Sequence, residues 1–197
     1  MDRLRLAFVP GVTPDRWARV WRERHPGVRL ELLPVEEDRQ RAVLDDGTAD
    51  LALVRLPVDR ERPTPLHQVV LYEERPVVVA ARDHFVAAAD EVTTDDLAEE
   101  QLVLPERSGW RPAAPQVDFP AMSAREAVEV AAAGSGVVVL PMAVARLHHR
   151  KDIVHRPVVD LPVTRVALVW RITDDSPLHQ DLVGITRGRR TGSGRGS

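Results

Sequence analysis

The chain has 197 residues, of which 44% are hydrophobic and 29% are charged, values that are ordinary for a globular protein of one or two small domains. Its net charge of -3 provides no overall basic field for attracting nucleic acid or anionic lipid, and the absence of cysteine excludes disulfides, thiolate nucleophiles and cysteine zinc sites. No apolar run is long enough for a signal peptide or a membrane helix, so we expect a cytoplasmic protein with no membrane partner.

The first 54 residues alternate between strand-like and helix-like segments. Apolar runs at residues 4–9, 28–33 and 50–54 predict three strands. Thr13 is expected to cap the first helix, with Pro14 at its first helical position. A second helix is expected from Glu36 to Gly47. This strand-helix alternation predicts a parallel sheet with right-handed crossovers.

The next segments are shorter and more polar. An apolar run at residues 69–80 follows a proline-containing connection, Thr94 is expected to cap a short helix, and residues 102–104 are expected to form a strand. A loop rich in proline and small residues covers 107–116. Near the end of the chain we expect a strand at 163–171 and a last helix at 176–186.

Residues 123–141 give the clearest local pattern in the chain. Ser123 and Glu126 have the spacing of a capping box, and Gly134 can adopt the left-handed conformation that ends a helix. Between them lies an apolar stripe at helical spacing, made of Ala127, Val128, Ala131 and Ala132. The apolar run 137–140 then predicts a strand covered on both faces, which Pro141 ends.

The wording Val-Glu-Val-Ala-Ala-Ala-Gly-Ser-Gly-Val-Val-Val-Leu-Pro at 128–141 resembles a signature of the effector-binding domain of LysR-type transcriptional regulators. Pro-Gly-Val at 26–28 and Leu-Asp-Asp-Gly-Thr-Ala-Asp-Leu-Ala-Leu at 44–53 resemble two further phrases of that family. The likeness covers about residues 3–186.

This resemblance implies an α/β fold with two Rossmann-like subdomains and a cleft between them, as in type 2 periplasmic binding proteins. Subdomain I is expected at 1–79 plus 162–186 and subdomain II at 80–161. Residues 187–197 form a basic tail of Arg, Gly and Ser that is expected to be disordered, because it lacks apolar residues.

The resemblance also implies a non-catalytic sensor of a small-molecule effector, linked to transcriptional regulation, that pairs as a homodimer. The family's winged helix-turn-helix and linker helix are not found before the first strand, so we expect no sequence-specific DNA binding by this chain. We favour a stand-alone effector domain over one whose amino half was removed.

Four residues of subdomain I are candidates for ligand binding. Val12 and Thr13 lie at the start of the first helix, where backbone amides are free. Glu37 falls where the resemblance implies a Ser or Thr that helps to hold an anionic effector, and Arg55 follows a strand that lines the family's cleft. A carboxylate at position 37 would repel a carboxylate ligand unless Arg55 neutralises it, so we expect a neutral or cationic ligand, or none. Arg55 can instead hold an anion or only pair with nearby acids.

Four residues of subdomain II are candidates as well. Ser108 and Trp110 lie in the loop after a predicted strand, where Trp110 can stack on a ligand or fill the core. Met122 and Ser123 begin the helix of the capping box, and there the capping role comes before ligand contact.

The sequence does not predict an enzyme, a metal site or a cofactor. His148 and His149 are adjacent, so a helix directs them away from one another, and no Gly-x-Ser-x-Gly or phosphate-binding loop occurs. The alternative to a sensor is a protein-interaction module with a degenerate cleft. Such a module would use the helix of Trp17 and Trp21, or contact nucleic acid through the basic tail.

Overall fold

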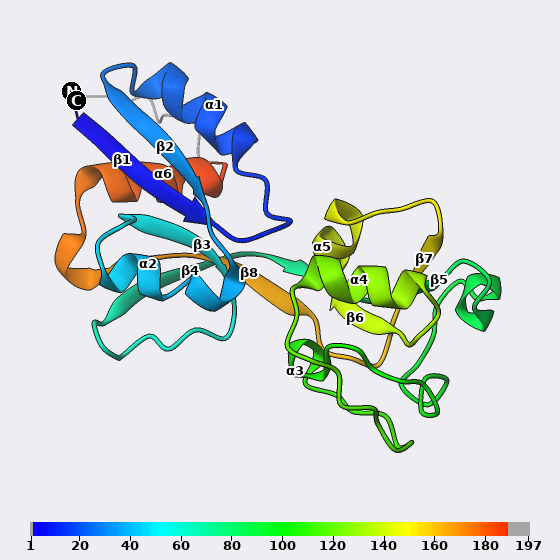
Figure 1. The fold of residues 1–197 in the computed structure, drawn as a ribbon. Coiled ribbons are helices and arrows are strands. Elements are labelled where there is room, and N and C mark those ends of the chain that lie inside the picture. Colours follow the sequence, from blue (N-terminus) through cyan, green and yellow to red (C-terminus); the bar gives the residue numbers. More distant parts are fainter. Residues whose placement is uncertain (1, 189–197) are drawn as a thin grey trace. The chain divides into compact units, whose positions relative to one another are not determined.

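The computed structural model describes residues 2–188 (Figure 1). Of the basic tail predicted at 187–197, all but Arg187 and Gly188 lies outside the described residues. The described chain divides into two compact units, residues 2–72 with 165–188, and residues 73–164. These boundaries differ from the expected 79 and 162, because the strand that begins at Pro76 pairs only with strands of the second unit.

The first unit is a five-stranded sheet with helices on both faces. The strand order is β2-β1-β3-β8-β4. Its elements are β1 (Asp2–Phe8), α1 (Asp15–Arg24), β2 (Val28–Pro34), η1 (Glu37–Arg39), α2 (Ala42–Asp45), β3 (Leu51–Arg55), β4 (Leu66–Glu74), β8 (Thr164–Arg171), η3 (Ile172–Asp174) and α6 (Pro177–Thr186).

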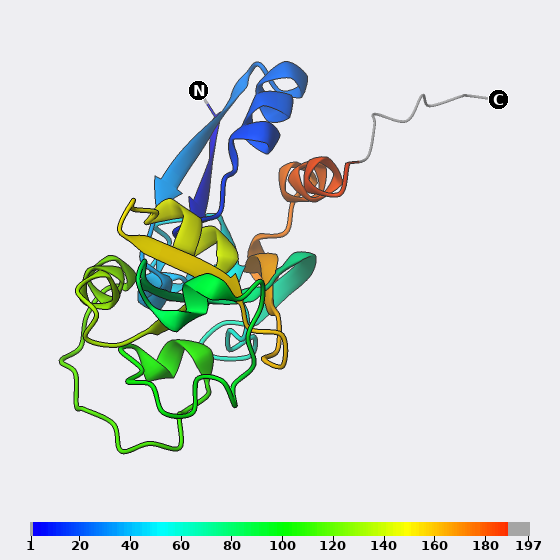
Figure 2. The same cartoon turned by 90° about the vertical axis from the view of Figure 1, so that its right-hand side faces the viewer.

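The first three strands are parallel, as the alternating pattern predicts. The returning strand β8 runs antiparallel to β3 and places Val166 opposite Arg55. Alternate residues of the sheet enter different cores, as the period of two requires. Leu51 and Leu53 pack on the face covered by α1 and α6, which lie side by side in Figures 1 and 2, whereas Ala52 and Val54 pack on the face of α2.

The second unit is built on a three-stranded sheet of order β6-β5-β7, in which β5 is antiparallel to both neighbours. All six residues of β5 are buried, because α4 and α5 cover one face and turns cover the other. Its elements are β5 (Pro76–Ala81), η2 (Phe85–Ala88), α3 (Pro105–Ser108), α4 (Ala124–Ala132), β6 (Val138–Pro141), α5 (Met142–Leu147) and β7 (Ile153–Pro157).

The helix, turn and strand predicted at 123–141 are confirmed as α4 and β6. Ser123 and Glu126 form the capping box, and Gly134 follows the helix with a φ of 74°. Gly136 then brings this turn against a neighbouring segment, since a Cβ there would lie 2.5 Å from the carbonyl oxygen of Gln101. A side chain at position 136 would therefore have to displace backbone.

The helix predicted from Glu36 to Gly47 is wrong as a single element. The structure has the short 3-10 helix η1, then a break, then the four-residue helix α2. At the break, the Gln40 side chain donates to the carbonyl of Arg55 and accepts from its backbone nitrogen, at 3.0 and 2.9 Å. These bonds to a strand come from the tertiary fold.

The expectations for the stretch around Thr94 also need correction, because turns replace the predicted helix. The Thr94 hydroxyl donates to Asp160 at 2.5 Å and does not cap a helix. The strand predicted at 102–104 is reduced to a single parallel bridge between Leu102 and Val137. The run predicted at 69–80 is divided between β4 and β5, with the break at Arg75.

Candidate functional site

Arg55 is the last residue of β3, and it is buried although it is charged. Only 2% of the residue is exposed, because β3 is a central strand with every residue buried. Its Nη1 donates to the carbonyl oxygen of Pro10 at 2.7 Å. Gln40 binds both backbone polar groups of Arg55, so the point from which the guanidinium extends is fixed.

Glu37 provides a carboxylate for this buried guanidinium. Its Oε2 lies 3.4 Å from Arg55 Nη1, and the side chains are 22% and 1% exposed respectively. A buried cation without an anion is strongly unfavourable, so this pair stabilises the lobe only while both partners remain. Of the two roles expected for Arg55, pairing with an acid is the one that the structure shows. Gln40 and the Pro10 carbonyl, which sequence analysis missed, complete the cluster, and no local pattern indicated them.

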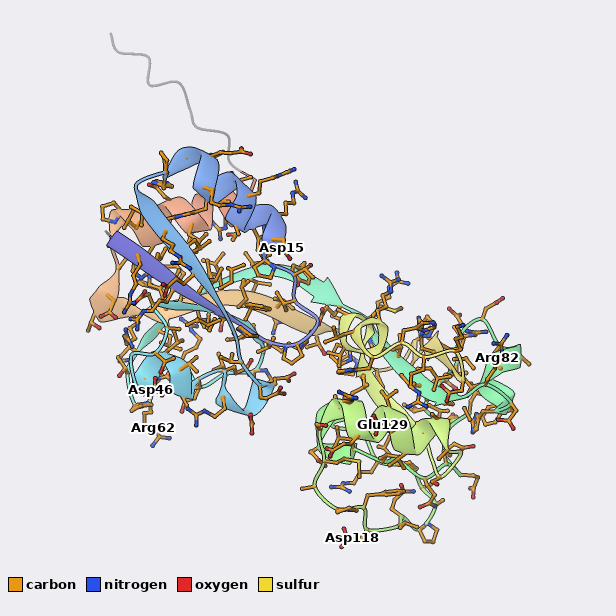
Figure 3. All side chains as sticks on the ribbon, turned by 45° about the horizontal axis from the view of Figure 1, so that its top comes forward. Asp15, Asp46, Arg62, Arg82, Asp118 and Glu129 are labelled. Carbon is orange, nitrogen blue, oxygen red and sulfur yellow. The ribbon has the colours of Figure 1, made fainter. Side chains whose placement is uncertain are left out.

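Val12 and Thr13 lie before the first helix, but Thr13 does not cap it. The N-cap is Pro14, without a side-chain cap, and α1 begins at Asp15 (Figure 3). The Pro14 carbonyl accepts from the nitrogens of Trp17 and Ala18 at 2.9 Å. A residue before proline is held away from helical conformation, which places Thr13 outside the helix start. Thr13 is exposed, whereas Val12 is buried in the core.

In the second unit, Ser108 and Trp110 form a tight local turn. The Ser108 hydroxyl donates to the Trp110 carbonyl at 3.1 Å and accepts from the Trp110 nitrogen at 3.2 Å. Gly109 between them has a φ of 66°, in the left-handed region that favours glycine. The Trp110 side chain packs against a core cluster that includes Val78 and Leu102, so its packing is that of a core residue.

Ser123 is committed to capping α4. Its hydroxyl accepts from the Glu126 nitrogen at 3.3 Å, and Glu126 Oε2 accepts from the Ser123 nitrogen at 2.8 Å. The hydrogen bonds from the backbone and hydroxyl of Ser123 lower the pKa of Glu126. Met122 is half-buried and packs against the core beneath the helix.

A cavity of about 320 Å³ lies within the second unit. None of the eight predicted site residues lines it. Leu102 and Val103 contribute buried side chains, and the loop that carries Asp118 (Figure 3) forms a wall. Gln101 and Gln116 hold that loop in place, since Gln101 accepts from the Val117 nitrogen and Gln116 accepts from the Leu102 nitrogen, at 2.7 and 2.8 Å.

Two further features were searched for within residues 2–188. No group of three or more His, Asp and Glu side chains there is arranged to hold a metal ion. No helix in the same range is long and apolar enough to cross a membrane.

Comparison with known proteins gives one family match, to the LysR substrate binding domain, over residues 1–190. The chain belongs to that family. It is a family of effector domains of LysR-type regulators and not of enzymes, so the predicted absence of catalysis stands on the family assignment.

Among curated proteins, this LysR substrate-binding domain is similar to the HTH-type transcriptional regulator AlsR of Bacillus subtilis (strain 168). The two are 21% identical over 198 residues, which is 93% of this chain and 63% of AlsR. The chain thus spans less than two thirds of that relative's length.

Solved structures confirm the fold of the LysR substrate-binding domain. The effector-binding domain of BenM with its effector benzoate has a TM-score of 0.75 at 20% identity, covering 95% of this chain and 91% of that one. A variant of the same BenM domain gives a TM-score of 0.77 at 19% identity over 96% and 94% of the two chains. The reduced form of OxyR gives 0.74 at 24% identity over 96% of each chain. The predicted fold class, a LysR-type effector domain of the type 2 periplasmic-binding-protein kind, is therefore confirmed.

Proposed function

We propose that this chain senses a small-molecule effector and relays its binding to transcription. The observation that carries the proposal is the family match over residues 1–190, together with a BenM domain of the same fold that is solved with its effector benzoate. Two compact units connected twice by the chain suit a sensor, because ligand binding can change how two lobes are arranged.

The ligand contacts in this proposal are the eight residues selected from the sequence. In the first unit, the backbone of Val12, the exposed Thr13 and the Glu37–Arg55 pair take part. In the second, the residues are as follows: Ser108, Trp110, Met122 and Ser123. The side chains of Val12 and Trp110 pack in cores, so their support for a ligand is through backbone and shape.

A thermal-shift screen of small metabolites tests the proposal. A specific ligand at about 100 times its dissociation constant stabilises a protein by about 2.7 kcal/mol, which corresponds to roughly 5 to 10 °C for a chain of this size. Thr13→Ala is a matched variant, because Thr13 is exposed and makes no cap, so the unliganded melting temperature should not change.

We expect the shift produced by a hit to shrink in Thr13→Ala. A hit whose shift is identical in wild type, in Thr13→Ala and in Ser108→Ala would place the ligand elsewhere, and the cavity beside Asp118 would become the first alternative.

A further inference from the structure

The guanidinium of Arg55 already has its anion. Its side chain is 1% exposed, and the atoms placed against Nη1 are the carbonyl oxygen of Pro10 at 2.7 Å and a carboxylate oxygen of Glu37 at 3.4 Å. Removing water from a cation without supplying an anion is costly, so this cluster is balanced only with a carboxylate in place.

The carboxylate comes from a separate segment and not from the strand itself. Glu37 begins the 3-10 helix η1, 18 residues before Arg55, and its side chain is 22% exposed. Gln40, in the same segment, fixes the Arg55 backbone. Of the two charged groups, Glu37 is the more accessible, so a ligand that approaches the pair meets a carboxylate before it meets the guanidinium.

We propose that Glu37 is a built-in counter-anion that occupies the place at Arg55 which a carboxylate ligand would need. This inference rests on the proposed sensing function and deepens it by naming a ligand class. Carboxylate effectors such as the benzoate of BenM are excluded from Arg55 in this chain, and the effector it accepts there is a hydrogen-bond donor that is uncharged or cationic.

The test is chemical rescue of Glu37→Ala. This variant leaves the Arg55 guanidinium buried with space where the carboxylate was, and its melting temperature should fall by roughly 6 °C or more. Sodium acetate and sodium benzoate should restore much of this loss with a saturable dependence on concentration. Sodium chloride at the same ionic strength, and the uncharged isostere benzamide, should not.

Two control variants isolate the cause. Glu36→Ala removes an exposed neighbouring carboxylate and should neither lower the melting temperature by more than about 1 °C nor respond to acetate. Glu37→Ala combined with Arg55→Met removes both charges, so it should be more stable than Glu37→Ala alone and insensitive to carboxylates.

Wild-type protein provides a measurement that does not depend on the variant folding. Calorimetric titration with benzoate should give no binding, because the Arg55 position is filled. Benzoate binding to wild type that Arg55→Met abolishes would overturn the proposal, and so would a folded Glu37→Ala variant that carboxylates stabilise no more than chloride does. Both results are independent of the metabolite screen, so a failure here is distinguishable from a failure of the sensing function.

Discussion

At the scale of single residues, His179 is a neutral group held in the core of the first unit. It is 6% exposed, its Nδ1 lies 2.7 Å from the Ser176 hydroxyl, and its Nε2 has no hydrogen-bond partner among the described residues. Burial lowers the pKa of His179, and the carboxylates of Asp50, Asp175 and Asp174 oppose that shift without cancelling it. In the second unit, burial likewise lowers the pKa of His155, helped by the nearby charges of His149, Arg146 and Arg156.

These lowered pKa values predict a loss of stability in mild acid. Each imidazole takes up its proton near pH 6.5 in the unfolded chain and only at lower pH in the folded protein. The stability is therefore fully present above pH 6.5 and is lost as the pH falls through the window below it, by at most about 1.4 kcal/mol per pH unit for each group. Urea unfolding at pH 7.5 and 5.5 measures this difference.

His179→Leu and His155→Leu should each reduce the pH dependence of the unfolding free energy, and the double variant should be flatter than either. If both single variants retain the full wild-type dependence, then other groups cause it.

At the scale of elements, the two longest-studied helix starts of this fold, those of α1 and α4, are built differently although both follow a hydroxyl residue. Ser123 caps α4 through its side chain, whereas Thr13 lies one residue too early for α1, whose N-cap is Pro14. The sequence pattern predicted a side-chain cap at both.

This difference predicts unequal costs for removing the two hydroxyls. Ser123→Ala should lower the unfolding free energy by about 1 kcal/mol, because it leaves first-turn amides of α4 without an acceptor. Thr13→Ala should change it by less than about 0.5 kcal/mol, as is usual for an exposed side chain without such a role. Denaturant unfolding of both variants measures the two values, and an equal loss would contradict the observed cap geometry.

At the scale of the whole molecule, the chain completes its first unit only at the end. Strand β8 lies between β3 and β4, pairs with β3 from Leu51 to Arg55, and places alternate residues in both cores of that unit. The second unit, in contrast, is one continuous segment with its own sheet and cores.

Truncation after Thr164 should therefore unfold one unit and spare the other. Without β8, the sheet of the first unit loses a central strand, and its buried backbone groups lose their partners. We expect the amide signals of residues 2–72 to collapse to unfolded positions in an NMR spectrum, while those of residues 73–164 stay dispersed. Dispersed signals from both segments would show that β8 is dispensable.

The sequence by itself determined the parts of this protein whose cause is local. The capping box at Ser123, the left-handed Gly134 and the apolar run that became β6 follow from residues within a few positions of each other. Phrases of the family at 26–28, 44–53 and 128–141 were sufficient to indicate the fold that the solved BenM and OxyR domains share.

The tertiary structure decided what depends on distant partners. The break between η1 and α2 lies where Gln40 binds the Arg55 backbone, and the Thr94 hydroxyl is bound by Asp160, 66 residues away. The same holds for the charge of the candidate site, because Glu37 and Arg55 neutralise one another only when the fold brings η1 to the end of β3. Hydrogen bonds and ion pairs act over a few ångströms of space and not of sequence, so a local pattern cannot contain them.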